Sequence, residues 1–252
     1  MFIMKNNWDC ENYTNHFSFV HRYGSALLDL LTVKPGSFVV DLGCGNGALT
    51  AQLQSRGFET LGIDASAAML EKAKKMHPDL RFELADACTF SLPEKADAVF
   101  SNAVFHWIDD QESLVQNIAA NLRPGGQLVF EFGGTGCGET VHRALGSAFA
   151  AHGLTYVNRF RFQSVGTFAP VLERHGFRVE YATLFDRPTE QDGENGLENW
   201  IRMFVGSAFA GVEGTTADSI VAQTVSDCCP VLYKNGKWIV DYVRLRMKAV
   251  KL

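Results

Sequence analysis

The chain lacks the features that mark several large classes of protein. No stretch approaches the ~20 consecutive apolar residues of a membrane-spanning helix, and residues 1–7 contain no apolar run long enough for a signal peptide. We therefore expect a cytoplasmic protein. Its 6 cysteines form no C-x-x-C pair and show no cysteine and histidine spacing suited to zinc. They are interpreted as small residues, and no metal site is predicted.

A surplus of basic charge is also missing. The chain has 23 Lys and Arg against 28 Asp and Glu, a formal net charge of -5. Because proteins that grip a phosphate backbone need clustered positive charge, nucleic acid is not expected as a partner. A length of 252 residues with 46% hydrophobic content suits one large domain with an embedded lid. We expect a monomer or homodimer that binds a small molecule.

The most informative segment is D-L-G-C-G-N-G at residues 41–47, directly after the β-prone residues 37–40. Glycine lets the backbone adopt positive φ and approach a ligand closely. Residues 48–53 then have the pattern of a helix. A strand, a glycine turn and a helix form the first crevice of a doubly wound α/β sheet, where nucleotide-like ligands bind.

The spacing of these glycines narrows the choice of ligand. The dinucleotide fingerprint is G-x-G-x-x-G, with a helix N-terminus that faces a pyrophosphate. In this chain the third glycine comes one residue early, and Asp41 precedes the loop. The spacing argues against an NAD-dependent oxidoreductase, which stays open as the alternative from another enzyme class.

Strands and helices alternate along the chain. Strands are predicted at residues 60–63, 80–85, 96–101 and 127–132, with a sharp turn at 123–126, and this order favours parallel pairing with helices on both faces. A further strand is predicted at residues 179–185. Residues 242–249 alternate between apolar and polar, which predicts an antiparallel strand whose polar face, with Arg244 and Arg246, is in water. The predicted fold is a doubly wound, Rossmann-like, mostly parallel seven-stranded sheet with an antiparallel last strand and a helical lid insert.

The predicted organisation has four parts. They are an N-terminal helical cover at residues 1–34, a Rossmann-like core at 35–187, a lid insert at 188–237 and a final core strand at 238–252. The lid is predicted from an apolar stripe at helical spacing that includes Leu197, Trp200 and Ile201. Such a stripe suits a wall packed over the crevice.

A series of short motifs stands at the predicted strand ends and in the lid. They are D-L-G-C-G-N-G at 41–47, G-I-D at 62–64, A-D-A at 85–87, S-N-A-V-F-H-W at 101–107, L-R-P-G-G at 122–126 and N-W-I-R-M-F at 199–204. In this order they resemble class I S-adenosylmethionine-dependent methyltransferases, most closely the trans-aconitate methyltransferase-like group. The resemblance implies S-adenosylmethionine as cofactor and methyl transfer to a small molecule. A non-catalytic S-adenosylmethionine-binding protein stays open as an alternative.

The resemblance also implies roles for the cofactor-binding residues. The backbone of residues 41–47 would line the methionine part, Asp64 would hold the ribose hydroxyls, and Asp86 and Ala87 would flank adenine. A carboxylate about 20 residues past the glycine loop is also where a ribose diol is generally bound. Each role has an alternative interpretation. In it, Asp64 only places a negative charge at a helix N-terminus, and Asp86 is an exposed loop residue. Tyr13 then belongs to an N-terminal segment that only packs on the core. The predicted cofactor-binding residues are Tyr13, Asp41, Gly43, Cys44, Gly45, Asp64, Ala65, Asp86, Ala87 and Asn102.

The methyl acceptor decides which side chains the chemistry needs. Methyl transfer from a sulfonium is an in-line displacement with a good leaving group, so alignment and exclusion of water supply most of the rate. A carboxylate acceptor is already ionised and needs cationic anchors, whereas a hydroxyl or amine needs a base, for which His106 is the candidate. The predicted acceptor-site residues are Trp107, Arg159, Arg161, Trp200 and Arg202. Solvated arginines, packing aromatics and a structural histidine are the alternatives, and Glu131 is either a pocket carboxylate or a cap of backbone donors.

Overall fold

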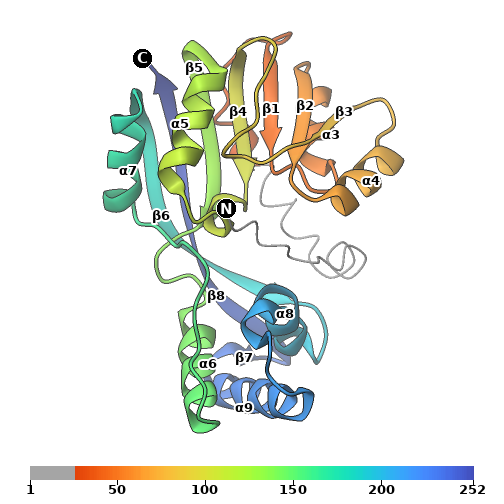
Figure 1. Ribbon diagram of the computed structural model, residues 1–252, viewed down its shortest axis with the longest axis vertical. Coiled ribbons are helices and arrows are strands. Elements are labelled where there is room, and N and C mark those ends of the chain that lie inside the picture. The colour runs from red at the N-terminus through yellow and green to blue at the C-terminus, as the bar shows by residue number, and fades with distance from the viewer. Residues whose placement is uncertain (1–25) are drawn as a thin grey trace. The chain divides into compact units, whose positions relative to one another are not determined.

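The computed structural model describes residues 26–252, which fall into two compact units (Figure 1). Of these residues, 26–135, 160–185 and 244–252 form the larger unit, and 136–159 and 186–243 form the smaller one. The strands β6 (Phe177–Gln191) and β8 (Lys237–Lys251) contribute residues to both. Residues 136–159, which the sequence analysis assigned to the core, therefore group with the predicted insert.

A single sheet orders its strands as β3-β2-β1-β4-β5-β8-β6, and β7 (Tyr233–Lys234) pairs with β8 off this path. The remaining strands are β1 (Phe38–Leu42), β2 (Glu59–Asp64), β3 (Arg81–Leu84), β4 (Ala96–Asn102) and β5 (Leu122–Gly133). The strands β1 to β5 pair in parallel, whereas β8 runs antiparallel to β5. The predicted doubly wound sheet with an antiparallel last strand is confirmed. Parallel strands bring their carboxyl ends to one edge, where ligands bind in this class of fold.

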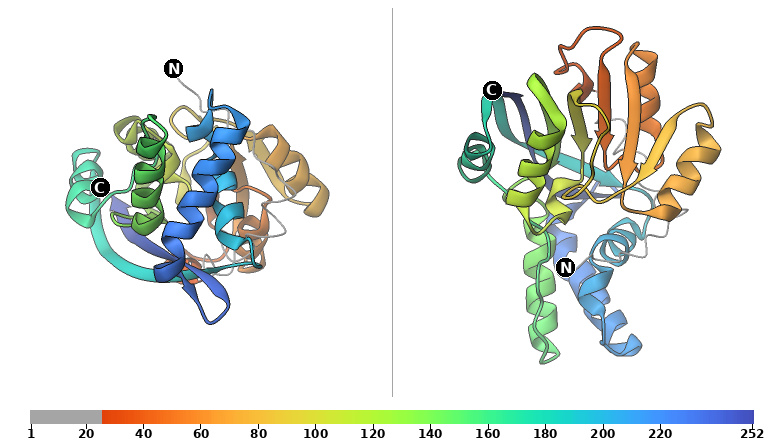
Figure 2. Two further views of the ribbon diagram at one scale, coloured as in Figure 1. Left: turned by 90° about the horizontal axis from the view of Figure 1, so that it is seen from below. Right: turned by 45° about the horizontal axis from the view of Figure 1, so that its top comes forward.

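Helices cover both faces of the sheet in the larger unit (Figures 1 and 2). They are α3 (Ala48–Ser55), α4 (Ala67–Met76), α5 (Gln111–Asn121) and α7 (Val165–Arg174). On one face, Leu114 of α5 and Phe168 of α7 pack against apolar residues of β4, β5 and β8. On the other, Leu49 of α3 packs with Leu27 and Leu28. Because parallel strands are apolar on both sides, both layers are needed to bury them.

The smaller unit is mainly helical. Its helices are α6 (Glu139–Ala151), α8 (Gly196–Phe204), the short 3₁₀ helix η2 (Gly206–Phe209) and α9 (Gly214–Leu232). The predicted apolar stripe lies on α8, where Leu197, Trp200 and Ile201 are buried. Helix α9 packs against α6 and α8 in a segment where the sequence predicted no element. Most of its buried residues, which include Ile220 and Thr224, recur every four positions and therefore lie on one face of the helix.

Two strands are longer than predicted. The predicted turn at residues 123–126 lies inside β5, where the register with β4 shifts between Ala96 and Ala98. The turn is therefore a bulge that interrupts one strand. The strand predicted around residues 179–185 extends as β6 to Gln191, well into the predicted insert.

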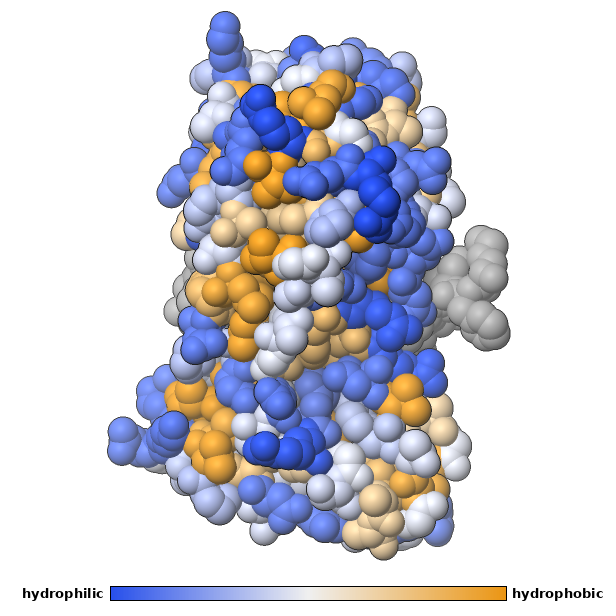
Figure 3. All heavy atoms as spheres, turned by 90° about the vertical axis from the view of Figure 1, so that its left-hand side faces the viewer, coloured by the Kyte–Doolittle hydropathy of each residue, from blue (hydrophilic) through white to orange (hydrophobic). Residues whose placement is uncertain are grey.

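Most of the predicted N-terminal cover, residues 1–34, lies outside the residues that the structure describes. Leu27 and Leu28 are fully buried, and residues 1–25 lie outside the described part of the chain. Among residues 26–252, no helix has the length and apolar character needed to cross a membrane. Figure 3 shows the side that carries α7 and β6, where apolar and polar side chains lie interspersed. Scattered apolar side chains of this kind, such as Leu184 of β6, are normal on a protein surface.

Candidate active site

The glycine loop is held between β1 and β2 by backbone hydrogen bonds. The N–H groups of Gly43 and Cys44 both donate to the carbonyl of Ile63, at 2.7 and 3.0 Å. Gly43 has φ 78°, and a Cβ at this position would lie 2.2 Å from a methyl carbon of Val104. Only glycine therefore allows the loop after β1 to approach the loop after β4 this closely.

Asp64 fastens this loop to the next helix. Its Oδ2 accepts from the N–H of Gly45 at 2.8 Å, and its Oδ1 accepts from the N–H of Ser66, also at 2.8 Å. Ser66 in turn caps α4. Burial raises the pKa of Asp64, although these backbone hydrogen bonds act against the rise. Each carboxylate oxygen retains a second lone pair, so the fixed side chain fits the predicted role of accepting from a ribose diol.

Asp41 and Cys44 lie in the same loop but are buried. Asp41 is 1% exposed and accepts from Oγ1 of Thr50 on α3 at 2.6 Å. Burial raises the pKa of Asp41 to about 7, and the Thr50 hydrogen bond opposes this shift. Burial, together with the charges of Asp41 and Asp64, also raises the pKa of the Cys44 thiol. A thiol that resists ionisation is a poor nucleophile, which favours the interpretation of Cys44 as a small loop residue.

Asp86 and Ala87 follow β3 as an ordered turn. Oδ1 of Asp86 accepts from the N–H of Cys88 at 2.8 Å. The carbonyl of Ala87 accepts from Nδ2 of Asn117 on α5 at 3.1 Å. These contacts fix the turn beside the carboxyl end of β2, and the predicted contact with adenine stays a prediction.

The carboxyl end of β4 carries local strain. Asn102 is buried, and Ala103 has φ 63°, an unfavourable value for a residue with a side chain. The N–H of Ala103 donates to the carbonyl of Glu131 at 2.7 Å, which holds this conformation in place. Strain of about 1–3 kcal/mol persists where surrounding contacts impose it, commonly at functional sites.

His106 is buried on the 3₁₀ helix η1 (Phe105–Trp107). Its Nδ1 accepts from the N–H of Gly133 at the end of β5, at 3.2 Å. Burial, and secondly the charge of Arg244, hold the pKa of His106 well below its ordinary value. The ring is therefore neutral with its proton on Nε2. In this tautomer His106 is a hydrogen-bond donor at Nε2, which favours a positioning role over the predicted general base.

Aromatic rings surround His106 on one side. Phe160 and Phe162 lie 5.1 Å apart in a stacked pair, and Trp107 lies 4.6 Å from Phe160. The N–H of Arg161 donates to the carbonyl of His106 at 2.9 Å, while its guanidinium pairs with Asp109 at 2.7 Å. The fold therefore brings the predicted residues Trp107 and Arg161 together, but the charge of Arg161 is already balanced.

An ion cluster that the sequence analysis did not find lies beside His106. Glu131 of β5 is 1% exposed, and its Oε1 accepts from Nε of Arg244 at 3.1 Å. Its Oε2 accepts from Nε of Arg246 at 2.7 Å. The prediction that the polar face of β8 lies in water is wrong for Arg244, which is 7% exposed. Glu131 is the one charged residue in the buried run at residues 128–133 of β5. A buried charge needs a cation, so this position is the signal from which the cluster could have been predicted.

The other predicted site residues lie in the smaller unit or outside the described residues. Nε1 of Trp200 donates to the hydroxyl of Tyr242 at 2.5 Å. Arg202 pairs with Glu198 and Asp218, both at 2.8 Å, and Arg159 is exposed. Their roles at the acceptor stay predictions. Tyr13 lies outside residues 26–252.

Comparison with known proteins identifies the class that this fold and glycine loop define. A family model described as a methyltransferase domain matches residues 40–130. An uncharacterized methyltransferase of Schizosaccharomyces pombe is 30% identical over 97% of this chain and 98% of its own. The chain belongs to the class I S-adenosylmethionine-dependent methyltransferases, and the NAD-dependent reading is set aside.

The chain is also similar to methyltransferases with a named substrate. These similarities either cover a shorter part of the chain or concern the fold alone. The trans-aconitate 2-methyltransferase of Methylobacterium radiotolerans is 36% identical over 58% of this chain and 56% of its own. The chain thus matches about half the length of this relative. Phosphoethanolamine N-methyltransferase 2 of Haemonchus contortus, solved with S-adenosyl-L-methionine, superposes with a TM-score of 0.58 at 21% identity, over 91% of this chain and 52% of that one.

Proposed function

We propose that this S-adenosylmethionine-dependent methyltransferase methylates a carboxylate of a small organic acid. The observation that carries the proposal is the buried positive charge of Arg244 beside the neutral ring of His106, at the edge where β4 and β5 end. Such an environment binds an anion, which favours an acceptor that is an organic acid. The similarity to trans-aconitate 2-methyltransferases supports the same class of acceptor.

The residues of the larger unit fit the cofactor. The glycine loop offers a backbone surface at Gly43 that any Cβ would obstruct, and Asp64 stands fixed beside it with acceptor capacity to spare. When bound, S-adenosylmethionine supplies an activated methyl group on a sulfonium. The ordered loops hold the reactants in line and keep water out.

A carboxylate acceptor removes the need for a base. Its oxygen is ionised at neutral pH and attacks the methyl carbon directly. His106, with Nδ1 occupied by the N–H of Gly133, then has to orient the acceptor through Nε2–H and takes up no proton. We further propose a cytoplasmic monomer or homodimer without a nucleic-acid partner.

The test is methyl transfer from labelled S-adenosylmethionine to a panel of carboxylates, phenols and amines, with trans-aconitate among the carboxylates. The expected product is a base-labile methyl ester. Asp64→Ala is the matched control, and we expect its affinity for S-adenosylmethionine to fall by about 10-fold or more, because charged hydrogen bonds are lost. Label found in phenols or amines and absent from every carboxylate would contradict the proposed acceptor.

A further inference from the structure

Strand pairing places Arg244 next to His106. Arg244 of β8 stands opposite Gly133 of β5, and Arg246 stands opposite Glu131. The N–H of the same Gly133 donates to Nδ1 of His106 at 3.2 Å. The guanidinium of Arg244, which donates to the side chain of Glu131, and the imidazole, which accepts from Gly133, are thus both held by the last residues of β5.

Among residues 26–252, the charges in this cluster do not balance. Glu131 contributes one negative charge, while Arg244 and Arg246 contribute two positive ones. The side chain of Glu131 is 0% exposed and that of Arg244 is 9% exposed, so water screens the remaining positive charge poorly. His106 adds no charge because it is neutral.

Arg244 also has unused donors. Its Nε donates to Glu131, and among residues 26–252 neither Nη group donates a hydrogen bond. A guanidinium has five N–H donors in a planar fork that matches a carboxylate. A nine-tenths buried guanidinium with free donors and surplus charge is suited to binding an anion.

The arginines that the sequence predicted as anchors differ from Arg244 in solvent exposure and in charge balance. Arg161 is half exposed and paired with Asp109, and Arg202 is half exposed and paired with Glu198 and Asp218. Their charges are balanced and accessible to water, so they would contribute little to the binding of an anionic acceptor.

Building on the proposed function, we propose that Arg244 and the Nε2–H of His106 bind a carboxylate of the acceptor that is not itself methylated. A guanidinium that holds both oxygens of a carboxylate lowers their nucleophilicity, so we assign the reacting oxygen to a second group of the acceptor. The acceptor then carries at least two anionic groups. Binding the remote one orients the other toward the methyl group.

Binding to the complex with S-adenosylhomocysteine tests this without turnover. The probe is tricarballylate, a saturated tricarboxylate, measured by calorimetry on the full chain, with the monocarboxylate crotonate for comparison. We expect Arg244→Gln to weaken tricarballylate binding by about 10-fold to 100-fold, the effect of a lost charged hydrogen bond. Arg244→Lys keeps the charge but loses the fork, so the expected loss is smaller. The affinity for S-adenosylhomocysteine should stay unchanged in both variants.

Arg246→Gln is the matched control, since it also removes an ion pair of Glu131 but leaves Arg244 in place. Equal weakening by Arg246→Gln and Arg244→Gln would show a structural effect and overturn the assignment. So would unchanged tricarballylate binding in both Arg244 variants. In kinetics with trans-aconitate, Arg244→Gln should raise KM far more than it lowers kcat. A purely structural role would instead lower the apparent kcat through loss of folded enzyme and leave KM unchanged.

The two proposals fail separately. If the wild type methylates monocarboxylates and neither binds tricarballylate nor methylates polycarboxylates, the carboxylate acceptor stands and the second anionic site is overturned. Labelled methyl transfer only to phenols or amines, without tricarballylate binding, would overturn both.

Discussion

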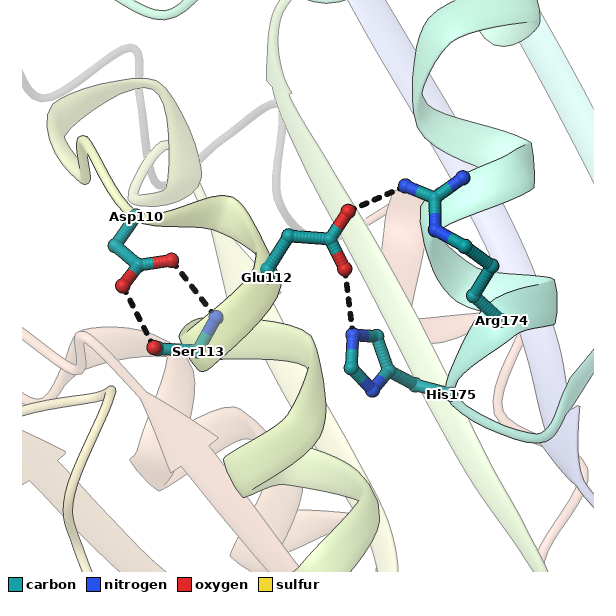
Figure 4. Close-up of polar contacts among 5 residues, drawn as sticks. All are labelled: Asp110, Glu112, Ser113, Arg174 and His175. Carbon is teal, nitrogen blue, oxygen red and sulfur yellow. Dashed lines mark hydrogen bonds and ion pairs between the residues drawn. The ribbon is translucent and has the colours of Figure 1, made fainter.

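Two carboxylates in the larger unit each meet two basic side chains, in opposite surroundings. Glu112 of α5 pairs with Arg174 at the end of α7 and with Nε2 of His175, the latter at 2.7 Å (Figure 4). Glu131 of β5 pairs with Arg244 and Arg246 of β8. The side chain of Glu112 is 53% exposed, and that of Glu131 is 0% exposed.

Burial changes how much each of these two ion clusters contributes to stability. Hydrogen bonds from Arg174 and then His175 lower the pKa of Glu112, but water and salt screen this cluster, so it adds little beyond a local clamp between α5 and α7. At Glu131 no solvent replaces a lost partner. The buried cluster therefore fixes both the charge and the geometry of the sheet edge beside His106.

The largest effect is expected from Glu131→Gln. Arg244, which is buried, and Arg246, which is partly buried, then lose their only buried counter-charge among the described residues. The free energy of unfolding should fall by about 3–5 kcal/mol, as when other buried pairs lose one partner. Urea denaturation measures this change.

A double variant provides the control for Glu131. Glu131→Gln with Arg246→Gln removes one of the two unbalanced charges and should recover part of the lost stability. A loss below about 1 kcal/mol in the single variant would show that the cluster behaves as an exposed pair.

The next effect, which depends on pH, is expected from Asp41→Asn. Burial raises the pKa of Asp41 to about 7, so between about pH 4 and pH 7 the folded chain holds a proton that the unfolded chain releases. This group therefore lowers stability as the pH rises through that window. Since asparagine cannot ionise, the stability of the variant relative to wild type should increase by up to about 1.4 kcal/mol per pH unit there.

Asp29→Asn is the comparison for this measurement, because Asp29 is 71% exposed and paired with Arg56. Because water and salt screen an exposed pair, the difference of this variant from wild type should be small, and it is measured over the same range of about pH 4 to 7. A constant difference for Asp41→Asn would mean that Asp41 ionises as an exposed carboxylate does.

The sequence predicted those parts of the site that depend on local pattern. The glycine loop, the strand ends and Asp64 could be found because each is specified within a few residues, as in the contacts of Asp64 with Gly45 and Ser66. The parallel pairing of the strands followed from their alternation with helices.

The sequence could not show what depends on long-range pairing. Glu131 and Arg244 are 113 residues apart and meet only because β8 returns antiparallel to β5. The periodicity of β8 identified its polar face but not that β5 and the loop of His106 bury it. Helix α9 was missed for a different reason: its buried face includes Thr224 and Cys228, and Pro230 lies within it, so its apolar stripe is weak.

The smallest effect is expected from Glu112→Gln. Its urea midpoint should agree with that of wild type within replicate error, because solvent replaces the contacts with Arg174 and His175. Salt at about 1 M shortens the screening length to about 3 Å and should remove any residual difference. The same salt should leave the loss from Glu131→Gln largely intact, since buried charges are screened much less. If Glu112→Gln instead lowers the free energy of unfolding as much as Glu131→Gln does, burial does not distinguish the two clusters. In that case the surplus charge on Arg244 no longer supports an anion-binding site there.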